Sequence, residues 1–220
     1  MPKSKKNKVV HTSKTESKGK EKKKELVEDI QKQLEKFEFA YIITPHNMRN
    51  TSIKDVRTQF PDSRFFFGKN RIMQRALGTS AEDEYKEGLH KLSEHLTGDS
   101  GLFLTNDKDT KVLQFFKDFK QKDYARAGFI ATETVVIPEG PLKFEHPMEP
   151  MLREQLRMPT ALKQGVIHLL ADFEVCTEGN ELTPEQGRIL KLFEKKMSEF
   201  YIDVECVWRK TDGKFKKLSS

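Results

Sequence analysis

The sequence predicts an α/β layered domain with a smaller, mostly β domain inserted into it. Short apolar runs rich in β-branched and aromatic residues alternate with segments of helical periodicity over residues 21–124. From Ala125 to residue 182 the helical periodicity is lost, and five prolines lie between short strand-like pieces. Helical periodicity returns at Thr183. We therefore assign 21–124 and 183–208 to one α/β core and 125–182 to the inserted domain.

The elements of the core are justified in chain order by their apolar spacing and their end signals. Apolar residues at helical spacing predict the first helix, and Asn50 and Thr51 are N-cap types for the second. Thr183 and Pro184 open the last helix as its N-cap and first helical residue. We expect helices from residue 21, from 50 and over 70–77, 82–96, 108–122 and 184–200, and strands over 39–44, 64–67, 101–106 and 202–208. Strand-like pieces of the insert cover 129–137, 165–171 and 172–176.

Positive charge is concentrated at the two ends of the chain. Residues 1–24 contain ten lysines and two glutamates, which leaves about −2 for the rest because the whole chain carries +6. Residues 209–217 add five cations against one aspartate. We expect 1–20 to be a disordered basic tail and 209–220 a second basic tail. Two basic ends favour an acidic polymer as the partner. For the first lysines, nuclear import is an equal alternative, and both roles are compatible.

Several classes of protein find no support in the sequence. No apolar run approaches the ~18 residues of a membrane span, and no signal peptide is recognisable. Cys176 and Cys206 lack a CxxC pattern, so we expect buried thiols in a reducing compartment. His90 and His95 are five residues apart, which does not fit a paired metal site on a helix. We expect no enzyme activity, no catalytic residues, no metal, no cofactor and no membrane partner.

The turn Gly68-Lys69-Asn70 stops a run of three phenylalanines and opens a helix. A nucleotide-binding P-loop requires glycine five positions before Gly68, where Ser63 stands, and serine or threonine in place of Asn70. A nucleoside triphosphate is therefore excluded as the ligand. A glycine turn at a helix N-terminus still suits an anion, including an RNA phosphate. The alternative is an ordinary strand-to-helix turn with a solvated lysine.

A second polar loop follows the first strand. In a parallel sheet, loops after successive strands line one edge, so we expect His46, Asn47 and Arg49 to face the glycine turn. Lysines in the first turns of the first helix oppose the helix dipole, which an RNA phosphate would explain. Clustered Arg, Lys and Asn over such a surface suit folded RNA.

Two segments resemble a known family. FFFGKNRIMQRAL (65–77) and ARAGFIATETVVIPEGPL (125–142) are similar to the eukaryotic stalk-base ribosomal protein of the L-ten family, and the resemblance covers about 20–208. The lysine-rich opening and short length resemble a nucleolar branch of that family that acts in ribosome assembly. The resemblance implies a three-layer α/β core that binds large-subunit rRNA at the stalk base, with 125–182 as the family's inserted domain. The rRNA contacts that carry over are Lys22, Lys23, Lys24, Asn47, Arg49, Asn50, Thr51, Lys54, Arg57, Gly68, Lys69, Asn70 and Arg75.

One departure from the stalk-base protein is informative. That protein continues into helices that recruit acidic stalk dimers, whereas this sequence ends at the basic GKFKKLSS. We therefore expect an rRNA-binding assembly factor that occupies the stalk-base site until the mature protein replaces it. The expected partners are the precursor large subunit with its rRNA and neighbouring ribosomal proteins, and a release factor that could dock on the insert, but no stalk dimers. The expected location is the nucleus and nucleolus, extending to the cytoplasm on late precursors.

Two other function classes stay open at this point. The first is a structural stalk-base protein of the translating ribosome. The second is an enzyme of RNA processing or mRNA decay, for which the sequence offers no active site.

Overall fold

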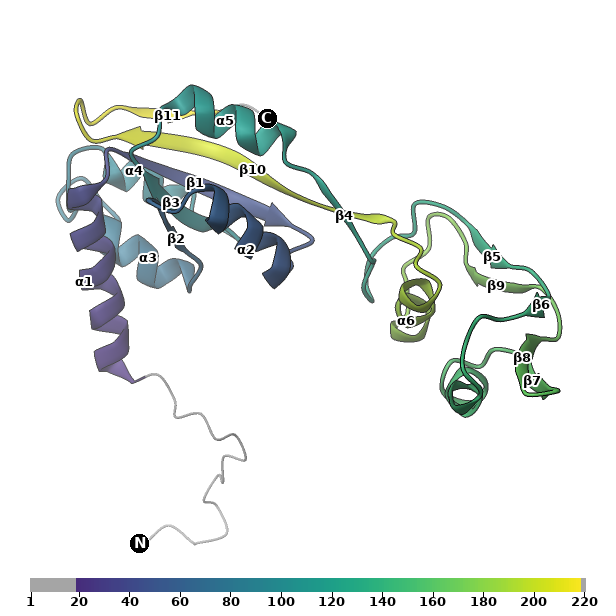
Figure 1. Ribbon diagram of the computed structural model, residues 1–220. Helices are drawn as coiled ribbons and strands as arrows, with labels where there is room; N and C mark the ends of the chain where they lie inside the picture. Colours follow the sequence, from purple (N-terminus) through teal and green to yellow (C-terminus); the bar gives the residue numbers. More distant parts are fainter. Residues whose placement is uncertain (1–18, 219–220) are drawn as a thin grey trace, which may run out of the picture. The chain divides into compact units, whose positions relative to one another are not determined.

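The computed structural model describes residues 19–218 (Figure 1). Almost all of the expected disordered tail over 1–20 lies outside the described residues, as do 219–220. The chain divides into two compact units, one comprising 19–44, 60–109 and 204–218, the other 45–59 and 110–203. The helices and strands are α1 (Lys20–Lys36), β1 (Phe39–His46), α2 (Asn50–Gln59), β2 (Arg64–Phe66), α3 (Asn70–Leu77), α4 (Leu89–Glu94), β3 (Gly101–Thr105), α5 (Asp109–Asp118), β4 (Gln121–Asp123), β5 (Val135–Ile137), β6 (Gly140–Pro141), η2 (His146–Met148), η3 (Met151–Gln155), β7 (Thr160–Lys163), β8 (Val166–Leu169), β9 (Phe173–Cys176), α6 (Pro184–Leu192), β10 (Ser198–Arg209) and β11 (Phe215–Lys217).

The main sheet has the strand order β11-β10-β1-β3-β2, and β4 joins by pairing with Ser198–Phe200 of β10. β3 is antiparallel to both β1 and β2, and it lies between them. The expected parallel sheet is therefore wrong. Sequence periodicity cannot distinguish these arrangements, because both leave the strands apolar on two faces. The predicted α/β alternation itself is confirmed.

One face of this sheet packs against α1, α3 and α4 of the first unit. The cluster includes Ile30 and Leu34 of α1, Met73 of α3 and Leu92 of α4, all at most 1% exposed. α1 and α3 lie side by side (Figure 1). On α3, Met73, Ala76 and Leu77 are buried as the spacing predicts. Ile72, which neighbours Met73 on the same helix, is only half-buried, because it lies towards α1 at the edge of the packed face.

The opposite face of the sheet carries a layer of aromatic rings. The rings of Phe65 and Phe103 stack with their centroids 4.3 Å apart, and Tyr41 lies 5.8 Å from Phe103. A Cβ on Gly101 would lie 2.5 Å from the ring of Phe67, so glycine is needed for that ring to cross β3. The phenylalanine run therefore fixes Phe67, the residue that precedes the Gly68 turn, against β3.

Two expected elements of the first unit are wrong. The polar helix over 82–96 shrinks to α4, because residues 81–88 form turns and Gly88 has the left-handed φ of 82°. The C-terminal basic tail is not a free tail, because β11 pairs with Cys206, Val207 and Trp208 of β10. The sequence did not predict this strand, because Phe215 is the one apolar residue among the lysines of the segment 214–217.

The second unit has its own hydrophobic cluster. Small sheets β5-β9 and β6-β8-β7 surround side chains such as Leu152, Ile167 and Val175. α6 begins with a capping box in which Thr183 and Gln186 bond reciprocally, which confirms the predicted helix start. The helix ends at Leu192, however, so its expected extension to Phe200 is wrong.

The packing also departs from the predicted domain limits, because Ile189 and Leu190 of α6 lie in this second cluster and not in the α/β core. The limits of the insert stay a prediction.

Of the helices in residues 19–218, none combines the length and apolar character needed to cross a membrane.

Candidate RNA-binding surface

The first turns of α1 present a cluster of cations. Lys20, Lys22, Lys23 and Lys24 are exposed, and Glu21 is the one acidic residue of the first turn. No side chain caps this N-terminus, which starts after Gly19. Cations here face the positive end of the helix dipole, so they weaken the helix. A bound polyanion would offset this effect.

The C-terminal end of α1 is held by two other lysines. Lys86 Nζ donates to the carbonyl oxygen of Leu34 at 3.4 Å, and Lys210 Nζ donates to that of Glu35 at 2.6 Å. Burial, with the nearby charge of Lys210, lowers the pKa of Lys86. Ile30 and Leu34 are buried in the same half of the helix. α1 is therefore anchored at its end, whereas its lysine-rich start has few packing contacts.

The Gly68 turn lies at the start of α3. Lys69 is the N-cap residue with extended backbone angles and makes no side-chain cap. Its carbonyl oxygen accepts from the amides of Ile72 and Met73 at 2.8 and 3.3 Å. Asn70 uses its side-chain amide nitrogen to bond the carbonyl oxygen of Gly98 at 2.8 Å. Asn70 thus fixes the turn from behind, which the sequence did not indicate, while Lys69 is exposed.

Two adjoining hollows run between α1 and α3, and we call them together the α1–α3 groove. Lys23 and Arg71 line both hollows, and Ile72 contributes apolar surface to each. Gly68 lies close to α1, since a Cβ there would be 3.8 Å from Leu26 Cδ2. The lining residues are Lys23, Gly68, Lys69, Asn70, Arg71, Ile72 and Gly98 in one hollow, and Lys20, Lys23, Lys24, Val27, Glu28, Gln31, Arg71, Ile72 and Arg75 in the other.

The groove unites part of the predicted surface. It brings together Lys23, Lys24, Lys69 and Arg75 with Gly68 and Asn70, from segments more than forty residues apart in the sequence. It adds Lys20 and Arg71, which the prediction left out. Lys20 is one residue before the expected helix start, and Arg71 is one turn from Arg75. Lys22 does not line the groove. It is two positions from both Lys20 and Lys24, and side chains two positions apart on a helix point about 200° apart.

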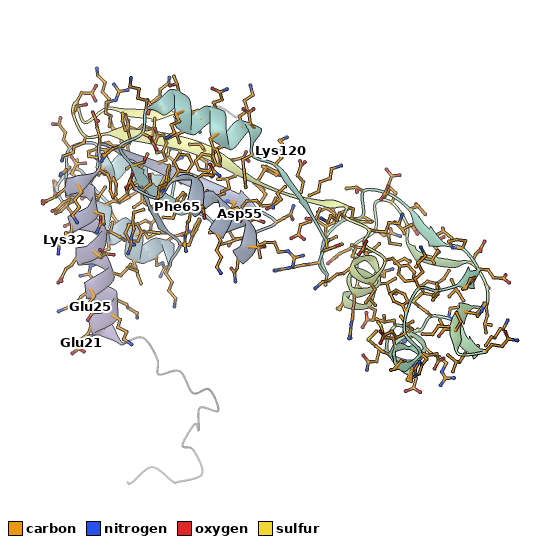
Figure 2. All side chains as sticks on the ribbon, in the orientation of Figure 1. Glu21, Glu25, Lys32, Asp55, Phe65 and Lys120 are labelled. Atoms are coloured by element: carbon orange, nitrogen blue, oxygen red, sulfur yellow. The ribbon has the colours of Figure 1, made fainter. Side chains whose placement is uncertain are left out.

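Three charged residues of α1 do not line the groove. Glu21, Glu25 and Lys32 are spaced so that they share a face of the helix (Figure 2). None of the three is among the lining residues of either hollow. Lys32 is therefore a natural control for the charge of the groove.

The other predicted residues belong to the second unit and form a separate set. Asn50, Thr51, Lys54 and Arg57 are exposed on α2. The argument that placed them beside Gly68 required a parallel sheet, and β3 separates β1 from β2. Their contact with RNA stays a prediction.

Two residues of this set are engaged within the protein. Arg49 Nε lies 2.6 Å from Asp123 Oδ2, and its NH2 group donates to the carbonyl oxygen of Tyr124 at 2.5 Å. Asn47, with φ of 52°, donates through its side chain to the carbonyl oxygen of Glu199 at 2.8 Å. Both residues hold the loop in place, and this use had no signal in the sequence.

Comparison with known proteins places this arrangement in a family. The sequence model of ribosomal protein L10 matches residues 18–121, and the model of the insertion domain in the corresponding 60S ribosomal protein matches 125–194. A protein of Dictyostelium discoideum called ribosome assembly factor mrt4 is 44% identical, over 96% of this chain and 95% of its own length. The protein of that name in Schizosaccharomyces pombe is 41% identical, over 100% of this chain and 96% of its own. The chain belongs to the mrt4 family.

The mrt4 family is related to the stalk-base proteins, as the resemblance predicted. The large ribosomal subunit protein uL10 of Thermococcus sibiricus is 26% identical over 76% of this chain, and the match covers 50% of uL10. Membership in a ribosomal-protein family also agrees with the prediction that the chain is not an enzyme. The described residues include no group of three His, Cys, Asp or Glu side chains that could hold a metal. His90 is instead paired with Glu84 at 2.5 Å.

Proposed function

We propose that the protein binds the large-subunit rRNA at the stalk base of precursor particles and acts there as an assembly factor. It leaves when the mature stalk-base protein replaces it. The single observation that carries this proposal is the α1–α3 groove in a chain whose near-full-length relatives are called ribosome assembly factors.

The charge of the groove fits an RNA backbone. Its α1 wall presents Lys20, Lys23 and Lys24, and its α3 wall presents Arg71 and Arg75. Glu28 is the one carboxylate among the lining residues of the described chain. Each phosphate that these cations neutralise releases counterions, which favours binding to a polymer of phosphates. A lysine-rich helix start is also expected of such a site, because the helix gains stability when the RNA is bound.

The Gly68 turn adds a contact of a different kind. Gly68 and Lys69 are exposed at the start of α3, where backbone amides and the helix dipole favour an anion. Lys69 lines the same hollow as Lys23 of α1. A phosphate held between them would link the two walls of the groove.

The family relationship supports the proposed exchange on the particle. The match to uL10 covers 76% of this chain but only 50% of uL10, so the two proteins share one region and differ in the rest. Two proteins that share an rRNA-binding region compete for one rRNA site. We therefore infer action in the nucleus and nucleolus, continuing in the cytoplasm on late precursors, next to neighbouring ribosomal proteins.

Crosslinking on native precursor particles tests this function. We expect Lys23, Lys69 and Arg75 to crosslink to the stalk-base rRNA, and Lys32 to give few or no crosslinks. Crosslinks confined to mRNA or tRNA would contradict the proposal. Mass spectrometry of polysomes washed at high salt separates the alternative, a structural protein of the translating ribosome, because only that protein would be retained stoichiometrically.

A further inference from the structure

Exposed apolar side chains are concentrated in one part of the described chain. Of the seven large hydrophobic residues exposed within 19–218, five lie between residues 130 and 170. Three of these five lie on or next to the β7–β8 hairpin: Leu162 is 52% exposed, Leu170 47% and Val166 43%. Val166 pairs with Lys163 and so lies on the face opposite to Leu162, which leaves Leu162 as the exposed apolar side chain of β7 itself.

The backbone of the hairpin shows which of its groups face outward. Its two-residue turn is formed by Gln164 and Gly165, with φ of 51° and 81°, as in a type I′ turn. This turn makes Lys163 and Val166 the closing hydrogen-bonded pair, so the next pair, Leu162 and Ile167, does not bond across the hairpin.

A contact on the other side of β8 agrees with this pattern. The carbonyl oxygen of Ile167 accepts from the amide of Leu142 at 2.8 Å, and so points away from β7. The amide and carbonyl of Leu162 therefore point out of the sheet edge, away from β8. β7 is the outer strand in the order β6-β8-β7, and β8 is its one strand partner among residues 19–218 (Figure 1).

The side chain of Leu162 lies at the border of a core. Opposite residues of a strand pair share a face, so Leu162 is on the face of Ile167 and Leu169. Those two are 0% and 1% exposed, and Leu162 is 52% exposed. The buried face thus stops at β7, where both an apolar side chain and unpaired backbone groups remain open. Strand addition uses these two features together.

We propose that the free edge of β7 binds an extended segment of a partner protein, which adds to this sheet as a fourth strand. The segment bonds to the outward amide and carbonyl of Leu162 and places an apolar side chain beside it. Lys163 is exposed on the face opposite to Leu162, and it is the one Lys, Arg, Asp or Glu in the hairpin over 160–169. The partner segment therefore carries a carboxylate on that face.

RNA fits this edge less well than a protein strand. One lysine offers little counterion release, whereas the α1–α3 groove presents five cations on its helix walls. The exposed side chains of the hairpin include no aromatic ring on which a base could stack. The inference concerns the inserted segment and does not depend on rRNA binding at the groove.

Hydrogen exchange on the full chain, free and on purified precursor particles, tests the inference. The amide of Leu162 has no strand partner in the free protein and should exchange fast, and its exchange should slow about tenfold or more on the particle. The amides of Ala161 and Lys163 bond to β8 and serve as an internal control. Fast exchange at Leu162 on a particle that protects α1 and α3 overturns this inference and leaves the proposed function intact.

A second measurement does not require the particle. A photo-crosslinking residue at position 162 should join to a protein segment in living cells, and one at the exposed position 178 should not. Crosslinks from 162 to RNA, or none, overturn the inference. Leu162→Asp keeps every backbone bond to β8 and places a charge where the partner's apolar side chain would lie, so it should abolish the particle-dependent protection of the amide at position 162 while the hairpin stays folded. Val166→Thr, which alters an exposed side chain away from the edge, should leave that protection unchanged.

Discussion

Lys210 Nζ donates to the carbonyl oxygen of Glu35 at 2.6 Å, and the backbone amide of Lys210 bonds to the carbonyl oxygen of Glu38 at 2.8 Å. Lys210, the residue after β10, thus bonds both to the last turn of α1 and to the link between α1 and β1. Lysines near a helix C-terminus stabilise it through its free carbonyls and its dipole. The end of α1 is fixed to the sheet, and this positions its lysine-rich start against α3.

Lys210→Met should loosen α1 without unfolding the first unit. We expect a loss of about 0.5 to 1 kcal/mol in the free energy of unfolding, because one exposed cation at a helix end is removed. Amide exchange in α1 should increase more than in β3. Lys91→Met, on exposed α4 surface, is the control. Equal exchange in α1 for the wild type and Lys210→Met would show that the bond does not hold the helix.

Lys69→Glu should weaken binding to a stalk-base rRNA fragment. The change replaces a cation of the α1–α3 groove by an anion, and we expect the slope of log affinity against log salt to fall by about one. Filter binding at several salt concentrations measures both quantities. Lys32→Glu makes the same charge change on α1 at a residue that does not line the groove, and should have a smaller effect on both. Equal effects of the two variants would mean that only net charge matters.

Gly68 separates backbone geometry from charge. A Cβ at this position would meet only Leu26 Cδ2 at 3.8 Å, an ordinary contact, and the residue needs no left-handed backbone. Gly68→Ala should therefore leave both the fold and RNA affinity nearly unchanged. Gly68→Glu should fold but bind RNA more weakly, because it places an anion at the turn. Circular dichroism and the same filter assay test this, and a large loss of affinity in Gly68→Ala would show a closer backbone approach than the structure indicates.

How far the sequence predicts this site depends on the range of each signal. The helix over 70–77 was predicted correctly because helical periodicity is local. The cationic run of α1 and the Gly68 turn were recognised for the same reason. Their meeting in one groove required the family resemblance, since no local pattern records which helices are neighbours.

The errors also have a physical cause. Strands buried on both faces look alike in parallel and antiparallel sheets, so the order β1-β3-β2 was missed. The ion pair of Arg49 with Asp123 was also missed, because it joins residues far apart in the sequence, and the contact of Arg49 with RNA stays a prediction. The segment 209–220 was interpreted only as a basic tail, because its charge hides the pairing of β11 with Trp208.

The two cysteines should resist alkylation in the native protein. Burial, reinforced by the Glu205 carboxylate, raises the pKa of Cys206 to about 12, and burial also raises the pKa of Cys176. At pH 8 each buried thiol is less ionised than in the unfolded chain, so iodoacetamide should react much faster after denaturation than before it. Because Cys206 in the unfolded chain ionises near its ordinary value of 9.0, its contribution to stability is complete below that pH. That contribution should fall as the pH rises from 9.0 towards 12. In the alkylation experiment, rapid reaction of the native protein at pH 8 would contradict the burial of the thiols.

Arg49 and Lys54 should behave in opposite ways, although both were predicted as RNA contacts. The Arg49–Asp123 pair is 2.6 Å long with side chains 25% and 24% exposed, so Arg49→Met leaves a partly buried carboxylate unpaired. We expect a loss of about 1 to 2 kcal/mol in stability, reduced from the value for a fully buried pair by solvent screening. The salt slope of RNA binding should not change. Lys54 is exposed on α2, so Lys54→Met should change the free energy of unfolding by less than about 0.5 kcal/mol. It should lower the salt slope if α2 contacts RNA. An unchanged stability in Arg49→Met, with a reduced slope, would return Arg49 to the RNA surface.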